Sequence, residues 1–380
     1  MRILFISPDI FSFHNYRLDL VTKLIKLGNE VILISPIKVS DDYRVVEIKK
    51  VGLKIVAIKL NKNKVNPFED IFYIINLIRY ILKLKPNIIF SYTIKPVIYS
   101  GISLNIISFI NKKRKIYSLS MITGLGFIYS KIFNLKALIL KPLIYILYKI
   151  SLIKTNAIIF QNKDDLKYFS NKKILNKKIK KVCIKGSGVD LEKFKLASLP
   201  NEHIFLMTSR LLIDKGVREY VNAARLVKEI FPDTKFYLAG SLDSNPNSIS
   251  KSELDDWITS GLINHLGFVK SIEKVLAKCR YFVLPSYYPE GIPRSILEAM
   301  AIGRPIITTN MPGCKETVVD KKNGFLVPPK NVERLVEKMI YLINSDENLI
   351  KEMGMNSRNL VMNNFEMDLI NDQIINLLPL

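Results

Sequence analysis

The chain has 380 residues, of which 48% are hydrophobic and 24% are charged, and this length predicts two domains, or three, each with its own core. Its three cysteines, Cys183, Cys279 and Cys314, are scattered and odd in number, which indicates a reducing cytoplasm and neither a disulfide framework nor a cysteine metal site. The net charge of +23 belongs to the first half of the chain, because residues 1–190 carry 34 Lys and Arg against 11 Asp and Glu, whereas residues 191–380 carry 23 of each. We therefore expect an anionic partner for the first half alone, whether nucleic acid, membrane surface or substrate.

The first half alternates short apolar runs with longer helical patterns. Residues 1–8 have no basic region before an apolar core, so they predict a buried first strand rather than a signal peptide. Buried strands are predicted over residues 3–7, 31–35, 55–60, 88–91, 115–118 and 157–161, with helices over 16–27, 72–84 and 138–153. Such alternation predicts a parallel sheet covered by helices on both faces.

The second half repeats this pattern after a change near residues 186–200. Strands are predicted over residues 203–209, 235–239, 281–284 and 305–308, and helices over 216–230, 272–277 and 293–301. Residues 367–377 are also helical in pattern. The fold class is therefore α/β, with two doubly wound domains and ligands at the carboxyl ends of the strands.

A pair of glutamates eight residues apart marks the most informative segment. Residues 289–305 read Pro-Glu-Gly-Ile-Pro-Arg-Ser-Ile-Leu-Glu-Ala-Met-Ala-Ile-Gly-Arg-Pro. Pro293 suits a first helical position, which places Glu290 in the loop before a helix and Glu298 inside it. Free N–H groups at a helix N-terminus suit a phosphate, and a carboxylate suits hydroxyl groups, so the pair fits a nucleotide sugar. Spacing alone equally fits an ordinary capped helix, or the acid–base pair of a hydrolase.

Two cations flank the start of the helix predicted over residues 216–230. Arg210 and Lys215 offer a guanidinium and a movable ammonium near a helix N-terminus, which suits a diphosphate leaving group. The alternative is two exposed charges, one of them paired with Asp214. Such cationic, phosphate-binding elements favour phosphate chemistry over hydrolysis of a neutral glycoside.

Four segments together resemble the retaining family 4 glycosyltransferases. Residues 289–305 are similar to the family's Glu-x7-Glu element, and Ser-Arg-Leu-Leu-Ile-Asp-Lys-Gly at 209–216 to its Arg/Lys diphosphate clamp. Gly-Ser-Gly-Val-Asp at 186–190 resembles its inter-domain motif, and Thr-Asn-Met-Pro-Gly-Cys-Lys-Glu at 309–316 the loop after its donor helix. This resemblance covers nearly the whole chain in the family's order. It implies the GT-B fold, in which two Rossmann-like domains face a central cleft.

The resemblance also implies domain and residue roles. Residues 1–190 would bind the acceptor and the membrane, with the tail 363–380 packing back on them, and residues 191–362 would bind the nucleotide sugar. Glu290, Arg210 and Lys215 would be catalytic, with the glutamate on sugar hydroxyls and the cations on the diphosphate. The other donor-binding residues would be Glu298 on the ribose, Gly291, Ile292 and Pro293 in the glutamate loop, and Phe268 and Val269, whose backbone would hold the base.

Within the family, the first half resembles bacterial enzymes that add an N-acetylhexosamine to a saccharide on undecaprenyl diphosphate. The similar segments are Tyr-Thr-Ile-Lys-Pro at 92–96, Ile-Thr-Gly-Leu-Gly at 122–126 and Gln-Asn-Lys-Asp-Asp at 161–165. The candidate acceptor-binding residues, each expected after a strand, are His14, Asn15, Lys95, Gly124 and Gly126. The Gly-rich turn that many relatives have after the first strand is missing here.

The sequence shows no metal-ligand constellation, no P-loop and no Gly-x-Gly-x-x-Gly after the first strand. Asp41-Asp42, Asp164-Asp165 and Asp255-Asp256 are expected to be exposed pairs. We therefore expect no cofactor and no metal, with a nucleotide sugar as co-substrate, and we do not expect a kinase or a dehydrogenase.

Residues 131–154 form a basic, apolar stretch without any acidic residue. It carries Lys131, Lys136, Lys141, Lys149 and Lys154 among apolar residues, and it is too often interrupted to span a bilayer. This pattern favours a helix lying in an anionic membrane interface; the alternative is a core-facing helix with a solvated lysine face.

These observations together predict a metal-independent, retaining glycosyltransferase, peripheral on the inner face of the plasma membrane. It would move a sugar from a UDP-sugar, an N-acetylhexosamine first among the candidates, to a polyprenyl-diphosphate-linked saccharide in surface glycan assembly, without nucleic acid as a partner. The alternatives are a sugar-nucleotide epimerase of the same architecture, a nucleic-acid-binding protein, and a non-catalytic membrane scaffold.

Overall fold

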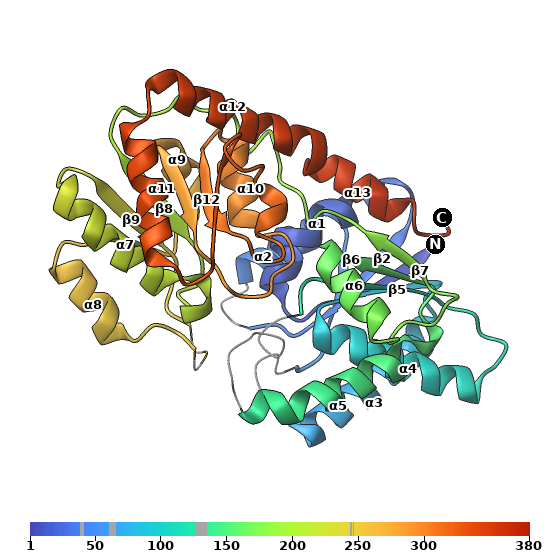
Figure 1. The fold of residues 1–380 in the computed structure, drawn as a ribbon. Helices are drawn as coiled ribbons and strands as arrows, with labels where there is room; N and C mark the ends of the chain where they lie inside the picture. Colours follow the sequence, from blue (N-terminus) through green and yellow to red (C-terminus); the bar gives the residue numbers. More distant parts are fainter. Residues whose placement is uncertain (39–41, 61–65, 126–134, 244, 246) are drawn as a thin grey trace. The chain divides into compact units, whose positions relative to one another are not determined.

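The computed structural model describes the chain apart from residues 39–41, 61–65, 126–134, 244 and 246 (Figure 1). The chain forms two compact units: Met1–Ser187 together with Asn371–Leu380, which we call unit 1, and Gly188–Ile370, which we call unit 2. The sequence placed the corresponding boundaries after residues 190 and 362. The expected cleft between the two domains stays a prediction.

Unit 1 contains a parallel sheet of seven strands in the order β3-β2-β1-β4-β5-β6-β7. The strands are β1 (Arg2–Ile6), β2 (Glu30–Ser35), β3 (Lys54–Ala57), β4 (Ile88–Tyr92), β5 (Tyr117–Ile122), β6 (Ala157–Phe160) and β7 (Lys180–Cys183). The central strands are buried along nearly their whole length, which explains their continuous apolar sequences.

Helices cover both faces of the unit 1 sheet. They are α1 (Ile10–Lys26), α2 (Asp42–Lys50), α3 (Pro67–Leu84), α4 (Ile94–Ile110), α5 (Leu135–Ser151) and α6 (Lys163–Asn171). Right-handed crossovers place α1 and α2 on one face and α3, α4 and α5 on the other, where α4 packs between its two neighbours (Figure 1). The C-terminal residues join unit 1 through an ion pair between Lys23 and Asp372 and a hydrogen bond from the Tyr117 hydroxyl to the carbonyl of Leu377, 2.7 Å long.

Unit 2 contains a parallel sheet of six strands in the order β10-β9-β8-β11-β12-β13. The strands are β8 (Ile204–Thr208), β9 (Lys235–Ala239), β10 (Asn264–Gly267), β11 (Tyr281–Leu284), β12 (Ile306–Thr309) and β13 (Gly324–Val327). The helices are α7 (Val217–Ile230), α8 (Lys251–Thr259), α9 (Ile272–Lys278), α10 (Arg294–Ala301), α11 (Val332–Asn344) and α12 (Glu347–Asn364), and α13 (Met367–Ile375) follows them.

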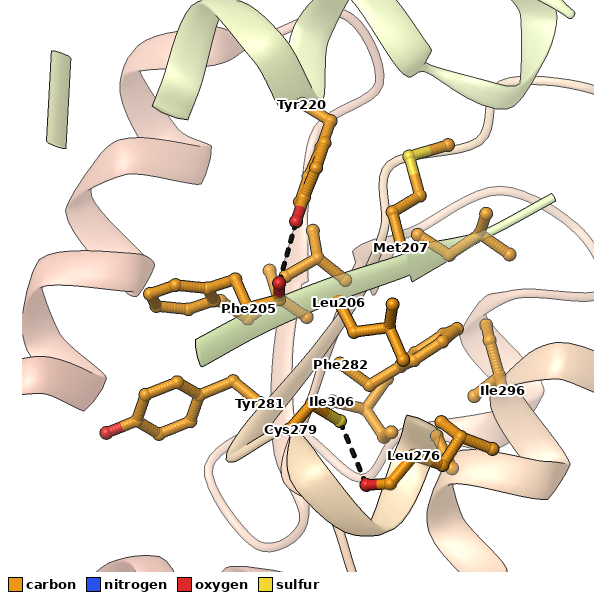
Figure 2. Packing of buried hydrophobic residues seen from close by; sticks show 14 of the residues in the cluster. Phe205, Leu206, Met207, Tyr220, Leu276, Cys279, Tyr281, Phe282, Ile296 and Ile306 are labelled. Carbon is orange, nitrogen blue, oxygen red and sulfur yellow. Dashed lines mark hydrogen bonds between the residues drawn. The ribbon is translucent and has the colours of Figure 1, made fainter. Parts of the chain in front are cut away.

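The core of unit 2 lies between the central strands and the helices beside them. Phe205 and Leu206 of β8, Phe282 of β11 and Ile296 of α10 belong to one cluster of buried hydrophobic residues, and Figure 2 shows Ile296 on the side of Phe282. The hydroxyl of Tyr220, on α7, donates a 3.0 Å hydrogen bond to the carbonyl of Phe205 (Figure 2). This bond satisfies the buried hydroxyl and fixes α7 against the strand that leads into the candidate site.

The prediction of two doubly wound α/β units is confirmed, because each strand order reverses once and every pairing is parallel. Several predicted elements have other bounds. The helices expected over residues 16–27 and 72–84 begin earlier, at Ile10 and Pro67. The strand expected over residues 115–118 begins at Tyr117 and continues to Ile122, and Pro293 is the N-cap of α10, with ψ 117°, rather than its first helical residue.

Candidate functional site

The strand order of unit 2 reverses between β8 and β11, so the loops that follow these two strands part at this point. The first loop runs from residue 209 to Gly216, where α7 begins, and the second from residue 285 to Pro293, where α10 begins. In open α/β sheets, the carboxyl-end crevice at such a reversal is the usual ligand site. Lys215 lies on the first loop and Glu290 on the second.

An ion pair joins the two loops. Lys215 Nζ lies 2.6 Å from Glu290 Oε2, and each side chain is 13% exposed. The hydroxyl of Ser286 donates to the other carboxylate oxygen of Glu290 at 2.8 Å. Lys215 Nζ also lies 5.4 Å from the ring centroid of Tyr288. The site therefore presents an ammonium and a carboxylate side by side, both held by protein neighbours and both reached by solvent.

Backbone contacts fix the loops beneath this pair. The amides of Tyr287 and Tyr288 donate to the carbonyl of Asp214 at 2.9 and 3.1 Å. Gly216 has φ +80°, and a Cβ there would lie 2.2 Å from the carbonyl oxygen of Pro285. Only glycine allows this approach and this backbone conformation, so the glycine of the Asp-Lys-Gly sequence is a requirement of the loop contact.

Two helices begin at the ion pair. The N-caps of α7 and α10 are Gly216 and Pro293, neither of which has a side chain that can accept a hydrogen bond. Neither N-cap side chain therefore occupies the first amides of these helices, and the helix dipoles favour an anion there.

Buried acids lie behind Lys215. Burial raises the pKa of Asp214 and of Glu219, and Lys330 and Lys215 partly offset the effect on Asp214. In the described part of the chain, Oδ1 of Asp214 and Oε2 of Glu219 have no hydrogen-bond partner. Burial and these acids also raise the pKa of Tyr287, whose ring lies 4.6 Å from Lys330 Nζ. Sequence reasoning missed this layer, because an isolated acid in a helix carries no signal of burial.

Arg210 lies on the same loop after β8 but pairs with a different residue. Its guanidinium is 55% exposed and pairs with Asp243 at 3.0 Å, not with Asp214. Lys215, in contrast, is almost enclosed. The alternative in which both cations are exposed is therefore wrong for Lys215, whereas Arg210 is an exposed charge with a different partner.

Glu298 lies inside α10, where Arg294 Nε contacts its carboxylate at 3.1 Å. Burial raises the pKa of Glu298, and Arg294 and Lys193 partly offset that rise. Gly291, Ile292 and Pro293, which connect it to Glu290, are buried. The loop after β12 packs on them, since a Cβ at Gly313, which has φ +86°, would lie 1.6 Å from the carbonyl oxygen of Gly291.

Phe268 and Val269 follow β10, the edge strand. The side chain of Phe268 is 61% exposed, and Val269 packs partly against the core. Two strand spacings separate β10 from β8, or about 10 Å. Phe268 and Val269 therefore follow the edge strand at the same carboxyl end of the sheet as the loop that carries Lys215.

In unit 1 the predicted acceptor residues follow three adjacent strands, β1, β4 and β5. His14 Nε2 lies 2.5 Å from Glu47 Oε2, and His14 Nδ1 lies 3.2 Å from Asn15 Oδ1. Lys95 Nζ lies 2.8 Å from Asp70 Oδ1. Gly124 follows β5 with φ +122°, and Gly126 lies outside the described residues.

Unit 1 also has a contact at its own strand-order reversal, which sequence reasoning missed. Between β1 and β4, the hydroxyls of Ser7 and Tyr92 lie 2.5 Å apart, and the hydroxyl of Ser12 lies 3.3 Å from that of Tyr92. Thr93 has φ +68°, which is rare outside glycine, and its buried hydroxyl has no hydrogen-bond partner among the described residues. Strained residues of this kind concentrate at ligand sites.

Among the residues that the structure describes, no three His, Cys, Asp or Glu side chains gather as a metal site. Asp41 lies outside them. Cys183, Cys279 and Cys314 form no disulfide. The described helices include none that is both long enough and apolar enough to cross a membrane.

Comparison with known proteins agrees with this geometry. The sequence model of the family described as "Glycosyl transferases group 1" matches residues 189–360. The chain is 30% identical, over 94% of its length and 93% of the other protein, to the N,N'-diacetylbacillosaminyl-diphospho-undecaprenol alpha-1,3-N-acetylgalactosaminyltransferase of Campylobacter jejuni. It is 28% identical to the UDP-Gal:alpha-D-GlcNAc-diphosphoundecaprenol alpha-1,3-galactosyltransferase of Escherichia coli, over 52% of this chain and 55% of that protein.

Among solved structures, Anabaena Alr3699/HepE in complex with UDP-glucose matches with a TM-score of 0.77, 18% identity and 99% coverage of both chains. These comparisons confirm the GT-B fold and the resemblance found in the sequence. The chain belongs to the group 1 family of glycosyl transferases, and it is a glycosyltransferase similar to enzymes that act on undecaprenyl-diphosphate-linked saccharides in bacterial glycan assembly.

Proposed function

We propose that this glycosyltransferase moves a sugar from a UDP-sugar to a saccharide linked to a polyprenyl diphosphate, with retention of configuration and without a metal ion. The observation that carries the proposal is the ion pair between Lys215 and Glu290 at the strand-order reversal of unit 2. The names of two relatives support the reactants: one carries UDP-Gal, and both carry a diphospho-undecaprenol acceptor. The whole-length relative favours an N-acetylhexosamine as the transferred sugar.

The ion pair suits a donor that is anionic at one end and a polyol at the other. The ammonium of Lys215 would bind the diphosphate together with the first amides of α7 and α10. The carboxylate of Glu290, kept in place by Ser286, would accept hydrogen bonds from sugar hydroxyls. Charges fixed before the reaction stabilise the departing diphosphate without reorganisation, which is the largest contribution that such a site makes to the rate.

The remaining donor contacts follow the strand order. Glu298 would hold the ribose, and the backbone of Phe268 and Val269 would hold the uracil. Arg210 would exchange Asp243 for the diphosphate when the donor binds; its 55% exposure leaves it room to move. A leaving phosphate oxygen can accept the proton of the acceptor hydroxyl, so the mechanism needs neither a protein base nor a metal.

Unit 1 would hold the acceptor at the carboxyl ends of β1, β4 and β5, near His14, Asn15, Lys95 and Gly124. A polyprenyl acceptor keeps its tail in the bilayer, so we propose that the enzyme works as a peripheral protein at the inner face of the plasma membrane, and that nucleic acid is not a partner. The reported relatives give no support to an epimerase, to a nucleic-acid-binding protein or to a scaffold.

The test is a donor and acceptor screen with purified full-length protein. UDP-GalNAc, UDP-GlcNAc, UDP-Gal and GDP-mannose are each offered with undecaprenyl-diphosphate-linked mono- and disaccharides, with and without EDTA. We expect one donor–acceptor pair to give an α-linked product by mass spectrometry and NMR, and we expect EDTA to leave the rate unchanged. Release of free or epimerised sugar without acceptor would overturn the proposed transfer reaction. A β-linked product would overturn the retaining mechanism.

A further inference from the structure

The outer surface of the α3–α4–α5 layer of unit 1 is apolar although no part of the described chain covers it. Twelve large hydrophobic side chains are exposed there: Phe68, Ile71, Phe72, Ile75 and Leu82 on α3, Ile106, Phe109 and Ile110 on α4, Leu143, Ile146 and Ile150 on α5, and Ile153 just after it. Phe68, Phe72 and Phe109 are 78%, 66% and 83% exposed. Contiguous exposed apolar surface on a monomer marks a contact with another molecule or a membrane.

The spacing of these residues shows that the surface is continuous along each helix. On α5, residues 143, 146, 150 and 153 are three or four apart, and on α3 residues 68, 72, 75 and 82 follow the same period, so each set forms one outward stripe. The inward faces carry other apolar residues, such as Leu77 and Tyr148, which are buried against the sheet. The alternative for residues 131–154 is a core-facing helix with a solvated lysine face. Helix α5 does face the core, through Ile144 and Tyr148, but its exposed face carries Ile146 and Ile150 beside Lys149. Lys131 and the side chain of Lys136 lie outside the described residues.

The same part of the chain has a one-sided charge. From residue 71 to residue 163 the sequence contains 14 Lys and Arg and not one Asp or Glu. Exposed cations lie within the stripes, as Arg79 and Lys149 do, and near the ends of the helices, as Lys83, Lys112, Lys113 and Lys154 do. The first turn of α3 adds two acids, the exposed Glu69 and Asp70, which pairs with Lys95. An apolar face on which cations outnumber acids in this way complements a surface with an anionic rim and an apolar interior.

A concave site lies at one end of this face. A cavity of about 330 Å³ is lined by Leu104, Ile107 and Ser108 of α4, by Lys112, Arg114, Lys115 and Ile116 of the next loop, and by Lys154 and Asn156. Four of these side chains are cationic and two can donate neutral hydrogen bonds, a donor set that suits phosphate oxygens. Phe109, Ile110 and Ile153 are exposed in the same segments, so an anion in the cavity would sit beside apolar side chains.

We propose that the outer surface of α3, α4 and α5 inserts into one leaflet of an anionic phospholipid bilayer, and that the basic cavity takes the phosphate of a lipid headgroup. This inference deepens the proposed function, since it names the surface and the lipid that would bring the enzyme to its lipid-linked acceptor. The stripes lie in the interface plane, with the phenylalanines among the acyl chains and the lysines among the headgroups. A second copy of the chain fits less well, because pairing two such faces would bring like charges together.

Insertion of the exposed apolar side chains is tested by flotation of the full-length protein with vesicles of phosphatidylcholine containing phosphatidylglycerol. The Phe72→Ser, Phe109→Ser double variant should lower the partition coefficient about a hundredfold. The matched control is Ile230→Ser with Met355→Ser, two exposed apolar residues of unit 2, which should bind like the wild type. Circular dichroism and the melting temperature check that both double variants fold. Equal binding of the patch and control variants would overturn the proposal.

The basic cavity is tested separately by Lys112→Gln, Lys115→Gln and Lys154→Gln in one protein. At low salt this triple variant should lose about a hundredfold in affinity for phosphatidylglycerol vesicles and little for pure phosphatidylcholine. Its control replaces three exposed lysines of unit 2 by Gln, Lys251, Lys274 and Lys278. Binding of inorganic phosphate at the same affinity as to the vesicles would show a free-anion site and overturn the headgroup assignment.

Insertion depth decides between a membrane and other occupants. The only tryptophan, Trp257, is replaced by Phe, and Phe109→Trp then reports on the apolar face. We expect a blue-shifted emission that brominated acyl chains quench. Vesicle binding without quenching would mean adhesion by charge alone, and a dimer in sedimentation that the Phe72→Ser, Phe109→Ser variant dissolves would mean a second copy; either result overturns insertion. None of these measurements requires glycosyl transfer. The proposal of a membrane-inserting surface and the proposed reaction can therefore be refuted independently of each other.

Discussion

Replacing Lys215 by Met should nearly abolish turnover while the protein stays folded. Methionine keeps the length of the side chain and removes the ammonium that lies 2.6 Å from Glu290. A preorganised charge aimed at a leaving group contributes about 100–1,000-fold to turnover, so we expect kcat to fall by about that factor. Glu290 would keep its hydrogen bond from Ser286 but lose its cation. Removing one partner of a fully buried pair costs about 3–5 kcal/mol. Both side chains are 13% exposed, so water recovers part of that cost, and we expect about 1–3 kcal/mol of lost stability.

The assay follows release of UDP with saturating acceptor and, in parallel, urea unfolding of each variant. The control is Lys235→Met, which breaks an ion pair with Glu202 on the surface of unit 2 and should change neither quantity measurably. Adding Glu290→Gln to Lys215→Met should restore part of the stability but none of the turnover, because the uncompensated carboxylate is gone. A Lys215→Met enzyme with kcat within about twofold of the wild type would refute the assigned role.

Four further outcomes follow from the same contacts. Ser286→Ala removes a hydrogen bond to the Glu290 carboxylate and should lower kcat about tenfold without changing the melting temperature by more than a few degrees. Gly216→Ala should destabilise unit 2 by at least about 2 kcal/mol, because the methyl group meets a backbone carbonyl, whereas Gly261→Ala, also at positive φ but facing open space, should cost about 1 kcal/mol in the same urea titration. Glu219→Gln should raise the melting temperature more at pH 8 than at pH 4.5. Burial raises the pKa of Glu219 in the folded state, so the protonated carboxyl contributes stability below the unfolded pKa. That contribution is lost as the pH rises through the folded pKa. Full turnover in excess EDTA is expected, and a loss that Mg²⁺ restores would mean that a metal takes part.

The fold was predictable because the central strands of both units are buried on both faces and read as continuous apolar runs. Strands β9 (Lys235–Ala239) and β11 (Tyr281–Leu284) coincide with their predicted bounds. The edge strand β7 escaped prediction for the opposite reason. Residues 180–183 of β7 read Lys-Lys-Val-Cys and are half exposed, so neither apolar content nor alternation marks them. The helix α4 escaped because apolar residues occur on every side of it, which leaves no period to detect.

The candidate site was predictable only in part. The spacing of Glu290 and Glu298 and the position of Lys215 near a helix start predicted phosphate and polyol chemistry. Nothing in the sequence shows that the side chains of Lys215 and Glu290 meet. Their contact depends on the strand order, which brings β8 beside β11 although 72 residues separate Thr208 from Tyr281. The apolar face of unit 1 was underestimated for a similar reason. Residues 68–82 and 106–110 look like core segments in sequence, and only the layer of helices shows that half of their apolar residues face outward.

The two strand-order reversals are built alike but differ in charge. In unit 2, the loops after β8 and β11 are joined by an ammonium and a carboxylate, supported by helix N-termini. In unit 1, the loops after β1 and β4 are joined by neutral hydroxyls, those of Ser7 and Tyr92, beside the strained Thr93. A fixed pair of opposite charges suits a ligand with a diphosphate, whereas neutral hydroxyls suit a saccharide. Much of the excess positive charge of unit 1 belongs instead to residues 71–163, which form most of the α3–α4–α5 layer, where it would meet lipid phosphates. If unit 1 docks on an anionic membrane as proposed, this division of charge would let it keep an uncharged contact for the acceptor sugar.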